Sequence, residues 1–266
     1  MIKTNNTNLL LRENILRNIV IFDNVRKSYS NEEKELHYKL IKDFFKETAN
    51  NKLGYYDTKN VEKLTHDSQQ NKILEICIKF LDKITKNCSE LSKIIDLGCG
   101  IGDFTIDLAK RYPQFKEIIG IDFLDEAIEL SKKYEKKFEN VKFMKNDLLN
   151  LPFKDRSYDI SVCINVIHHI HITDFEKALN ELARITDKYL ILEIRNKKNI
   201  FNLWYKYFAL PILFRNLPVY SCSITDVNNI LKNQKLVLEM AKGIYSRTWI
   251  CWRLLLIYKR VNVNSN

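Results

Sequence analysis

The 266-residue chain lacks several features that would assign it to a class at once. No apolar run reaches the roughly 18–20 residues that cross a membrane, and the polar start MIKTNNTNLLLRENILRN does not resemble a secretory signal. The six cysteines form no Cys-x-x-Cys pair, which argues against a zinc site and against a disulfide framework. There is no internal repeat and no low-complexity tract. We therefore expect a globular, cytoplasmic protein without a bound metal.

Acidic residues are scarce in one part of the chain only. Residues 196–266 hold 11 Lys and Arg against 2 Asp and Glu, a net charge of +9. Residues 91–195 hold 16 against 18, and residues 1–90 hold 16 against 13, so the formal charge of +10 is almost entirely C-terminal. A basic region favours an anionic partner such as nucleic acid or a membrane surface. The charge therefore concerns the C-terminal region and not the whole fold.

The spacing of apolar residues predicts an α/β protein. Helical stripes dominate residues 1–90, and from residue 93 onward short apolar runs alternate with amphipathic segments. We expect strands over 93–97, 117–121, 141–144, 158–164 and 189–194, helices over about 103–111, 125–137 and 174–185, then a helix over about 225–232, an apolar stretch at 236–240 and a strand over 248–259. Buried strands separated by helices predict a parallel sheet with helices on both faces.

These patterns divide the chain into four segments. Residues 1–90 form a helical N-terminal extension or lid, and 91–195 form the core. Residues 196–222 are an aromatic insertion, and 223–266 supply a helix and the last strands of the same domain.

A glycine loop follows the first expected strand. Residues 96–102 read DLGCGIG, and Gly98, Gly100 and Gly102 would let the backbone pass close beneath a ligand and turn into the next helix. The Gly-x-Gly-x-x-Gly pattern of nicotinamide-dependent dehydrogenases is not met, because position 103 is Asp. That rival enzyme class is therefore disfavoured.

Three carboxylates stand where strands are expected to end. Asp96 precedes the first glycine, where a carboxylate repels a pyrophosphate but suits a cationic amino group. Asp122 lies 20 residues beyond Gly102, a position that suits the hydroxyls of a ribose. Asp147 follows the third strand, where a carboxylate can accept from the exocyclic amine of adenine. Together they predict a ligand that is cationic and carries an adenosine.

At this point the sequence resembles the class I S-adenosylmethionine-dependent methyltransferase family. The resemblance covers about 93–195 and rests on DLGCGIG (96–102), IGID (119–122), KNDL (145–148), LPF (151–153) and NVIHHI (165–170). It implies S-adenosylmethionine (SAM) as cofactor and a Rossmann-like, seven-stranded, mostly parallel sheet with an antiparallel last strand. Residues 236–259 would supply strands six and seven.

The resemblance also implies a set of cofactor-binding residues. The glycines would lie beneath the methionine moiety, Asp96 near its amino group, Asp122 at the ribose, and Asp147 at the adenine. The full set is Asp96, Gly98, Cys99, Gly100, Gly102, Asp122, Phe123, Asp147, Leu148 and Asn165.

The segment after the fourth strand, residues 165–171, bears on the acceptor of the methyl group. It lacks the Asn/Asp-Pro-Pro-aromatic motif of adenine- and amide-methylating enzymes, and no Cys follows Pro or Thr as in pyrimidine-C5 enzymes. The remaining resemblance is to the branch that acts on small molecules and lipids, including ubiquinone and menaquinone methyltransferases. His169, and after it His168, are candidate general bases. Alternatively these histidines pack and cap the next helix, and in-line positioning alone supplies the rate.

Aromatic residues outside the core are candidates for the substrate pocket. They are Tyr55 and Tyr56 in a Gly-Tyr loop, Trp204 and Tyr207 in the insertion, and Tyr220. The basic aromatic segment 197–215 is interpreted in three ways: as a lid over the acceptor, as a membrane-surface helix, or as core or dimer packing.

The sequence thus predicts a methyltransferase that moves a methyl group to an O, N or C atom of a small aromatic, lipid-like or anionic acceptor. An RNA methyltransferase that uses the basic C-terminal region is the first alternative, and we rank nucleic acid lower as a partner. A non-catalytic SAM-binding scaffold is the second. The oligomeric state does not follow from the sequence.

Overall fold

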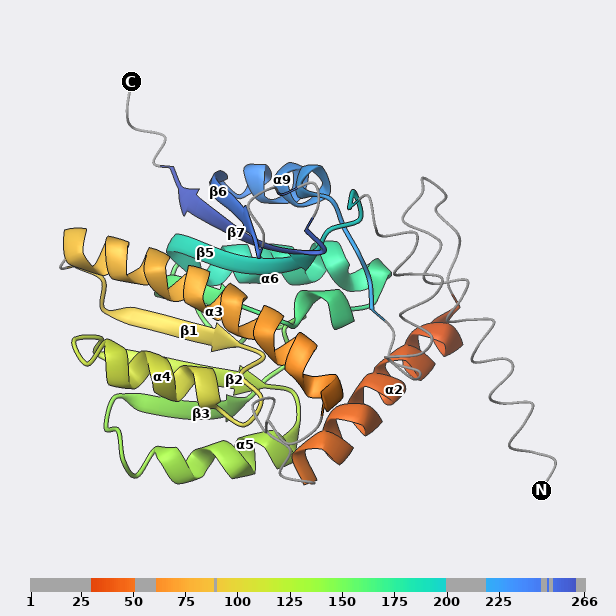
Figure 1. Cartoon of the computed structure of the whole chain (residues 1–266), viewed down its shortest axis with the longest axis horizontal. Helices are drawn as coiled ribbons and strands as arrows, with labels where there is room; N and C mark the ends of the chain where they lie inside the picture. Colours follow the sequence, from red (N-terminus) through yellow and green to blue (C-terminus); the bar gives the residue numbers. More distant parts are fainter. Residues whose placement is uncertain are drawn as a thin grey trace.

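Seven strands form one sheet in the order β3-β2-β1-β4-β5-β7-β6 (Figure 1). The computed structural model describes residues 30–50, 61–88, 90–199, 219–244, 248 and 251–261, without the side chains of 48, 50 and 61–70. The strands are β1 Lys93–Leu97, β2 Glu117–Asp122, β3 Val141–Lys145, β4 Tyr158–Cys163, β5 Thr186–Arg195, β6 Leu236–Gly243 and β7 Arg253–Arg260.

The direction of the strands agrees with the sequence prediction. Strands β1 to β5 pair in parallel, and β7 lies antiparallel to both β5 and β6. Apolar runs such as KIIDL and EIIGI are buried on both faces, as strands inside a parallel sheet require. The mostly parallel sheet with an antiparallel last strand is therefore confirmed.

Helices cover both faces of the sheet (Figure 1). One face carries α3 (Val61–Asn87), α4 (Asp103–Arg111) and α5 (Asp125–Ser131), and the other carries α6 (Phe175–Ile185) and α9 (Ile224–Asn233). Because side chains alternate along a strand, β1 sends Ile94 into the apolar cluster under α3 and α4, and Ile95 into the cluster under α6 and α9.

Helix α2 (Asn31–Asn50) does not cover a face of the sheet. It crosses the end of the sheet toward which β1 points (Figure 1). The helix begins with a capping box, in which the Glu33 N–H donates to Ser30 Oγ (3.1 Å) and the Ser30 N–H donates to Glu33 Oε2 (3.0 Å). Ion pairs hold both ends: Lys34 to Asp174 at 2.6 Å, and Lys46 to Glu126 at 2.7 Å.

The last strand begins later than the sequence pattern predicts, at Arg253 instead of residue 248. The reason is Asn196, the residue that follows β5. Its side-chain amide donates to the carbonyls of Thr248 (3.2 Å) and Cys251 (3.1 Å), and its backbone N–H donates to the carbonyl of Trp252 (2.7 Å). These three carbonyls therefore accept from Asn196, and β7 begins only after them, at Arg253.

Among the helices that the structure describes, none has the length and apolar content needed to cross a membrane.

Candidate active site

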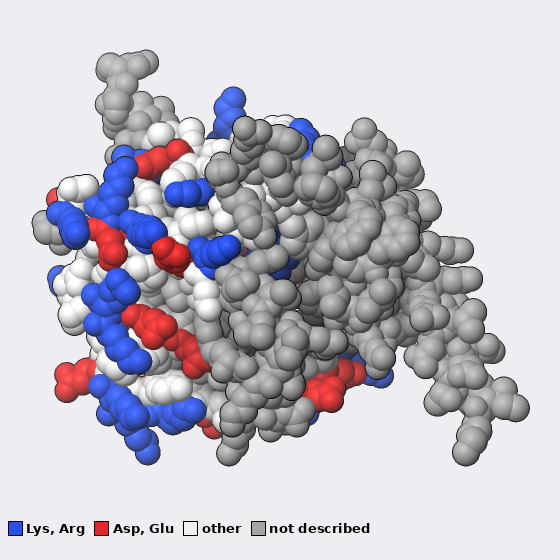
Figure 2. Space-filling model, in the orientation of Figure 1, with Lys and Arg blue, Asp and Glu red and all other residues white. Residues whose placement is uncertain are grey.

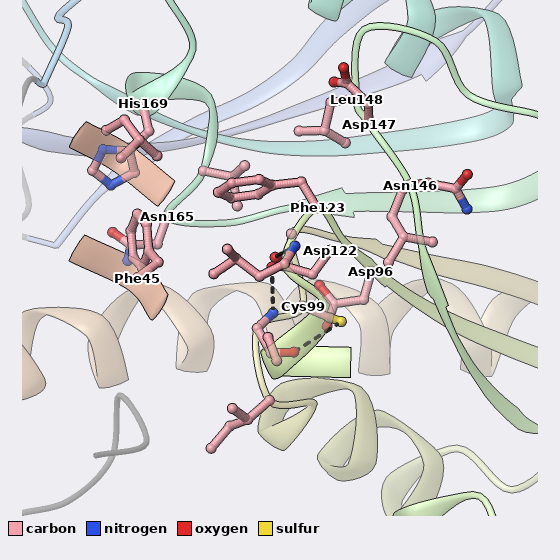
Figure 3. Close-up of a pocket in the computed structure, with 18 of the residues that line it drawn as sticks. Phe45, Asp96, Cys99, Asp122, Phe123, Asn146, Asp147, Leu148, Asn165 and His169 are labelled. Carbon is pink, nitrogen blue, oxygen red and sulfur yellow. Dashed lines mark hydrogen bonds between the residues drawn. The ribbon is translucent and has the colours of Figure 1, made fainter. Parts of the chain in front are cut away.

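A cavity of about 760 Å³ opens at the carboxyl ends of β1, β2 and β4, beneath α2 (Figure 3). Its walls come from the glycine loop, the end of β2, residues 145–149, residues 164–170 and one face of α2. The carboxyl end of a doubly wound sheet is where this kind of fold places ligands. The cavity is therefore the candidate active site.

The glycine loop forms the floor of the cavity. Gly98, Gly100 and Gly102 have φ values of +79°, +54° and +88°, which L side chains rarely adopt. A Cβ at Gly98 would lie 2.3 Å from a methyl group of Val166, whereas a Cβ at Gly100 would meet no atom within 4 Å. Gly98 thus permits close packing of the loop on the segment after β4, and Gly100 leaves open space beside the loop.

Asp96 lies at the end of β1 and lines the cavity, although it is almost fully buried. Its Oδ2 accepts a hydrogen bond of 2.6 Å from Thr105 Oγ1. Burial raises the pKa of Asp96 to about 7; the Thr105 hydroxyl lowers it and the nearby Asp122 carboxylate raises it further. A cationic ligand group here would offset the free-energy cost of burying the ionised Asp96 carboxylate.

Asp122, the last residue of β2, is held by the backbone on both of its oxygens. Oδ2 accepts from the Gly100 N–H at 2.9 Å and Oδ1 accepts from the Leu124 N–H at 3.0 Å. Burial raises the pKa of Asp122, and these N–H groups, with that of Phe123, counteract the rise. The carboxylate therefore shapes the glycine loop and still has acceptor capacity for a ligand.

Cys99 belongs to the loop but is no candidate nucleophile. Burial raises the pKa of its thiol well above the ordinary value, and the carboxylates of Asp96 and Asp122 raise it further. A thiol in such surroundings stays protonated and unreactive.

One end of the cavity is formed by residues that follow β2 and β3 (Figure 3). Phe123 is 38% exposed and presents a ring to the cavity, and Leu148 is buried in its wall. Asp147 is exposed, and its Oδ1 accepts from the Leu149 N–H at 2.9 Å. An aromatic face, an apolar wall and a carboxylate suit a flat heterocycle that carries an amino group.

The other end of the cavity brings together Asn165, His169 and Phe45 (Figure 3). Asn165 follows β4 in a left-handed conformation with φ +63°, which asparagine tolerates better than most residues. The Phe45 ring from α2 meets the His169 ring edge to face at a centroid distance of 5.2 Å. His169 is thus the histidine of the 168–171 group that lines the cavity.

Some predicted residues lie elsewhere. Gly102 begins α4 and is not part of the cavity wall. His168 lies behind the wall, 3.2 Å from an Arg195 nitrogen, and Tyr220 packs its ring at 5.3 Å from that of His37. The structure therefore does not bring these three to the cavity.

Four predicted substrate residues lie outside the described residues: Tyr55, Tyr56, Trp204 and Tyr207. Their assignment stays a prediction.

The cavity-lining residues of α2 were not among the site residues predicted from the sequence. These are Tyr38, Ile41, Lys42, Phe45 and Ala49. Their three- and four-residue spacing places them on one helix face. This spacing predicts that the helix buries one face, but it does not indicate which part of the protein that face contacts.

Residues 94–188 match the family model described as a methyltransferase domain. Demethylmenaquinone methyltransferase of Staphylococcus saprophyticus is 32% identical over 100 residues, which are 37% of this chain and 42% of that protein. YcgJ, an uncharacterised methyltransferase of Bacillus subtilis, is 34% identical over 103 residues, or 38% of this chain and 39% of that protein. The matched part of the chain thus spans about two fifths of the length of these curated relatives.

Solved structures resemble the chain over more of its length. Magnesium protoporphyrin IX methyltransferase (ChlM) of Synechocystis PCC 6803, with bound S-adenosylhomocysteine (SAH), has a TM-score of 0.66 at 19% identity and covers 84% of this chain and 100% of its own. The 1,6-didemethyltoxoflavin-N1-methyltransferase of Burkholderia thailandensis has a TM-score of 0.61 at 9% identity and covers 90% and 94%. At these identities the likeness concerns the fold.

The family match identifies a methyltransferase domain over residues 94–188, and the order of the strands agrees with it. The resemblance to methyltransferases predicted from the loop and the carboxylates is confirmed for residues 94–188. The described residues contain no group of three or more His, Cys, Asp or Glu placed to hold a metal ion.

Proposed function

We propose that this protein is a methyltransferase that uses SAM and acts on a small acceptor with an aromatic or otherwise apolar body. The observation that carries the proposal is a single cavity in which Asp96, Asp122 and Asp147 line the sheet side, and an apolar helix face lies opposite. SAM supplies a methyl group activated by a sulfonium centre.

The residues on the sheet side fit that donor. The Asp96 carboxylate would bind the amino group, and the two oxygens of Asp122 would accept from the ribose hydroxyls. Phe123 and Leu148 would enclose the adenine, and Asp147 would accept from its amine. A side chain at position 100 would fill the open space beside the loop, and glycine leaves that space to the donor. We assign the donor to this half of the cavity.

The opposite half would receive the acceptor. Ile41, Phe45 and Ala49 on α2 and Ile170 line the cavity, and the Phe45 ring lies against His169 in this half. Such a surface excludes water and aligns an apolar body, which brings the two reactants into line. The acceptor lone pair would bond to the methyl carbon as the carbon–sulfur bond breaks, with its electron pair left on sulfur. A proton on the acceptor would pass to His169 or to water.

The proposal is tested by incubating the protein with methyl-labelled SAM and a cell extract, then separating metabolites, lipids and RNA. Calorimetry with SAM and SAH comes first. We expect binding of both and label in the metabolite or lipid fraction. Absence of binding would refute the proposal, and label confined to RNA would refute the small acceptor.

The pH dependence of donor binding gives a second check. Asp96, with its pKa of about 7, is mostly protonated below pH 7 and then no longer attracts the amino group. We expect SAH affinity, measured by calorimetry, to fall by up to tenfold for each pH unit below 7 and to level off above it. Asp96→Asn is the control: it should bind weakly and with a much flatter pH dependence. An equally steep dependence in the variant would assign the effect to another group.

The face shown in Figure 2 has no continuous basic surface among its described residues, so this face does not favour an RNA acceptor. Basic and acidic side chains intermingle on the face shown in Figure 2. Many form exposed pairs, such as Lys79 with Glu75 and Lys132 with Glu129. Membrane contact through 197–215 stays a prediction, because most of that segment lies outside the described residues.

A further inference from the structure

We infer that Arg195 is a positioning residue for methyl transfer: it fixes the side-chain amide of Asn165 so that its N–H₂ group is offered to an oxygen of the acceptor. The inference rests on the proposed function and deepens it. It names a chemical feature of the acceptor, an oxygen that accepts a hydrogen bond beside the atom that is methylated.

The contacts of Arg195 carry the inference. This residue ends β5, is 5% exposed, and does not line the cavity. Its Nη2 lies 2.8 Å from Asn165 Oδ1 and 3.2 Å from His168 Nε2. One guanidinium nitrogen therefore contacts a cavity-lining residue and the histidine behind it.

A guanidinium can only donate hydrogen bonds, and this fixes the state of both partners. Asn165 must turn its oxygen to Arg195, which places the N–H₂ group on the other branch of the amide. His168 must accept at Nε2, so it is neutral and carries its proton on Nδ1. His168 is thereby excluded as the general base, because its free lone pair is already used.

The position of Arg195 is itself secured by a buried ion cluster. Glu193, which is completely buried, binds Arg195 Nη1 through Oε1. It also binds Arg253 from β7, with Nε–Oε1 at 2.6 Å and Nη2–Oε2 at 2.9 Å. The same carboxylate accepts from the backbone N–H of Asn165 at 2.9 Å. Backbone and side chain of Asn165 are thus held from one cluster, as a site that must stay rigid requires.

The direction of the Asn165 amide decides which acceptors fit. The Oδ1 branch faces the buried guanidinium, so the N–H₂ branch is the one available to the cavity that Asn165 lines. In this half of the cavity, where Phe45 and Ile170 are apolar and His169 is the neighbouring polar residue, this donor would select a ring or chain that carries a carbonyl or ionised hydroxyl oxygen. Such a hydrogen bond also orients the acceptor toward the donor half.

Two substitutions separate positioning from packing. Arg195→Lys keeps the charge beside Glu193 but cannot replace the fixed fork of donors. Asn165→Asp keeps the shape, tolerates the left-handed backbone and still pairs with Arg195, but has no N–H₂ group. Arg184→Lys is the matched control. Arg184 also binds carbonyls and a carboxylate, at Leu151, Phe153 and Glu181, but away from this cluster.

The first measurement needs no donor. With ¹⁵N-labelled histidine, the five histidines give few enough signals to assign by substitution. We expect a neutral, Nδ1-protonated His168 in the wild type and in Arg184→Lys, and a mixture of tautomers in Arg195→Lys. A wild-type His168 protonated on Nε2 would overturn the inference.

The second measurement is label transfer into the fraction that the wild type methylates. For both Arg195→Lys and Asn165→Asp we expect about 10- to 100-fold slower transfer at saturating SAM. For Arg195→Lys, whose side chain does not line the cavity, the affinity for SAH should change less than about threefold. Equal transfer in Arg195→Lys and Arg184→Lys would overturn the inference. Failure of the wild type to bind SAH would instead refute the proposed function.

Discussion

Replacing Asp122 with alanine is expected to weaken the binding of SAH at least 100-fold. The substitution removes a carboxylate proposed to accept from two ribose hydroxyls. It also releases the N–H groups of Gly100 and Leu124, which the carboxylate now holds at 2.9 and 3.0 Å. A hydrogen bond to a charged group contributes about 1.5–3 kcal/mol, so the loss of two accounts for a factor of this size or more. Calorimetry with SAH measures it directly.

The matched control for this substitution is Asp125→Asn, three residues further along the chain. Asp125 is exposed and pairs with Lys145 at 2.5 Å, an interaction that solvent screens strongly. We expect its affinity for SAH to stay within about threefold of the wild type. If both variants bound SAH like the wild type, the assignment of Asp122 to the donor would be wrong.

The largest effect on stability is expected from Glu193→Gln. The side chain is completely buried and binds both Arg195 and Arg253, so the neutral amide would leave two buried guanidinium groups without their carboxylate. Removing one partner of a buried ion pair costs about 3–5 kcal/mol in the free energy of unfolding. Urea unfolding followed by circular dichroism should show a lower midpoint with an unchanged slope.

The pH dependence of that stability has a definite sign. Burial acts to raise the pKa of Glu193, but the charges of Arg253 and Arg195 outweigh it and hold the pKa below the ordinary value of 4.5. The unfolded state therefore takes up its proton first on acidification, and the stabilisation is lost as the pH falls below about 4.5. Below about pH 4.5 the free energies of unfolding of the wild type and of Glu193→Gln should therefore become more similar.

An exposed pair serves as the comparison for Glu193. Glu75 pairs with Lys79 one helical turn away at 2.5 Å, and both side chains are more than half exposed. We expect Glu75→Gln to leave the midpoint of urea unfolding nearly unchanged, because solvent screens this exposed pair. A loss in Glu193→Gln as small as this would mean that other groups compensate the two arginines.

The strands and the glycine loop could be predicted because their signals are local. A strand buried on both faces must be a continuous apolar run, and KIIDL or EIIGI admits few other interpretations. Gly98 and Asp122 could be placed for the same reason, since each lies at the end of such a run. Side chains that follow parallel strands gather at one edge of the sheet.

The ion cluster could not be predicted, because it depends on a register between distant strands. Arg195 of β5 lies directly opposite Arg253 of β7, a pairing of like charges that a sequence pattern would disfavour. Glu193 stabilises this pairing because its carboxylate accepts hydrogen bonds from both arginines. No local spacing indicates which residue near position 253 meets Arg195.

The position of α2 also could not be predicted from local sequence patterns. Its stripe predicted a helix with one buried face, but its partners, Asp174 and Glu126, are far away in sequence. Only the packed structure shows that this face closes the cavity.

The cavity is lined both by residues inside the stretch that matches the methyltransferase family and by residues of α2, which precedes it. The donor half lies within the domain that matches the methyltransferase family, whereas α2 lies before that match begins at residue 94. A mutation on the inner face of α2 can therefore alter what is accepted without disturbing how the methyl donor is held. On the proposed assignment, the N-terminal helix is therefore the part of the chain in which substitutions would change the acceptor and leave donor binding intact.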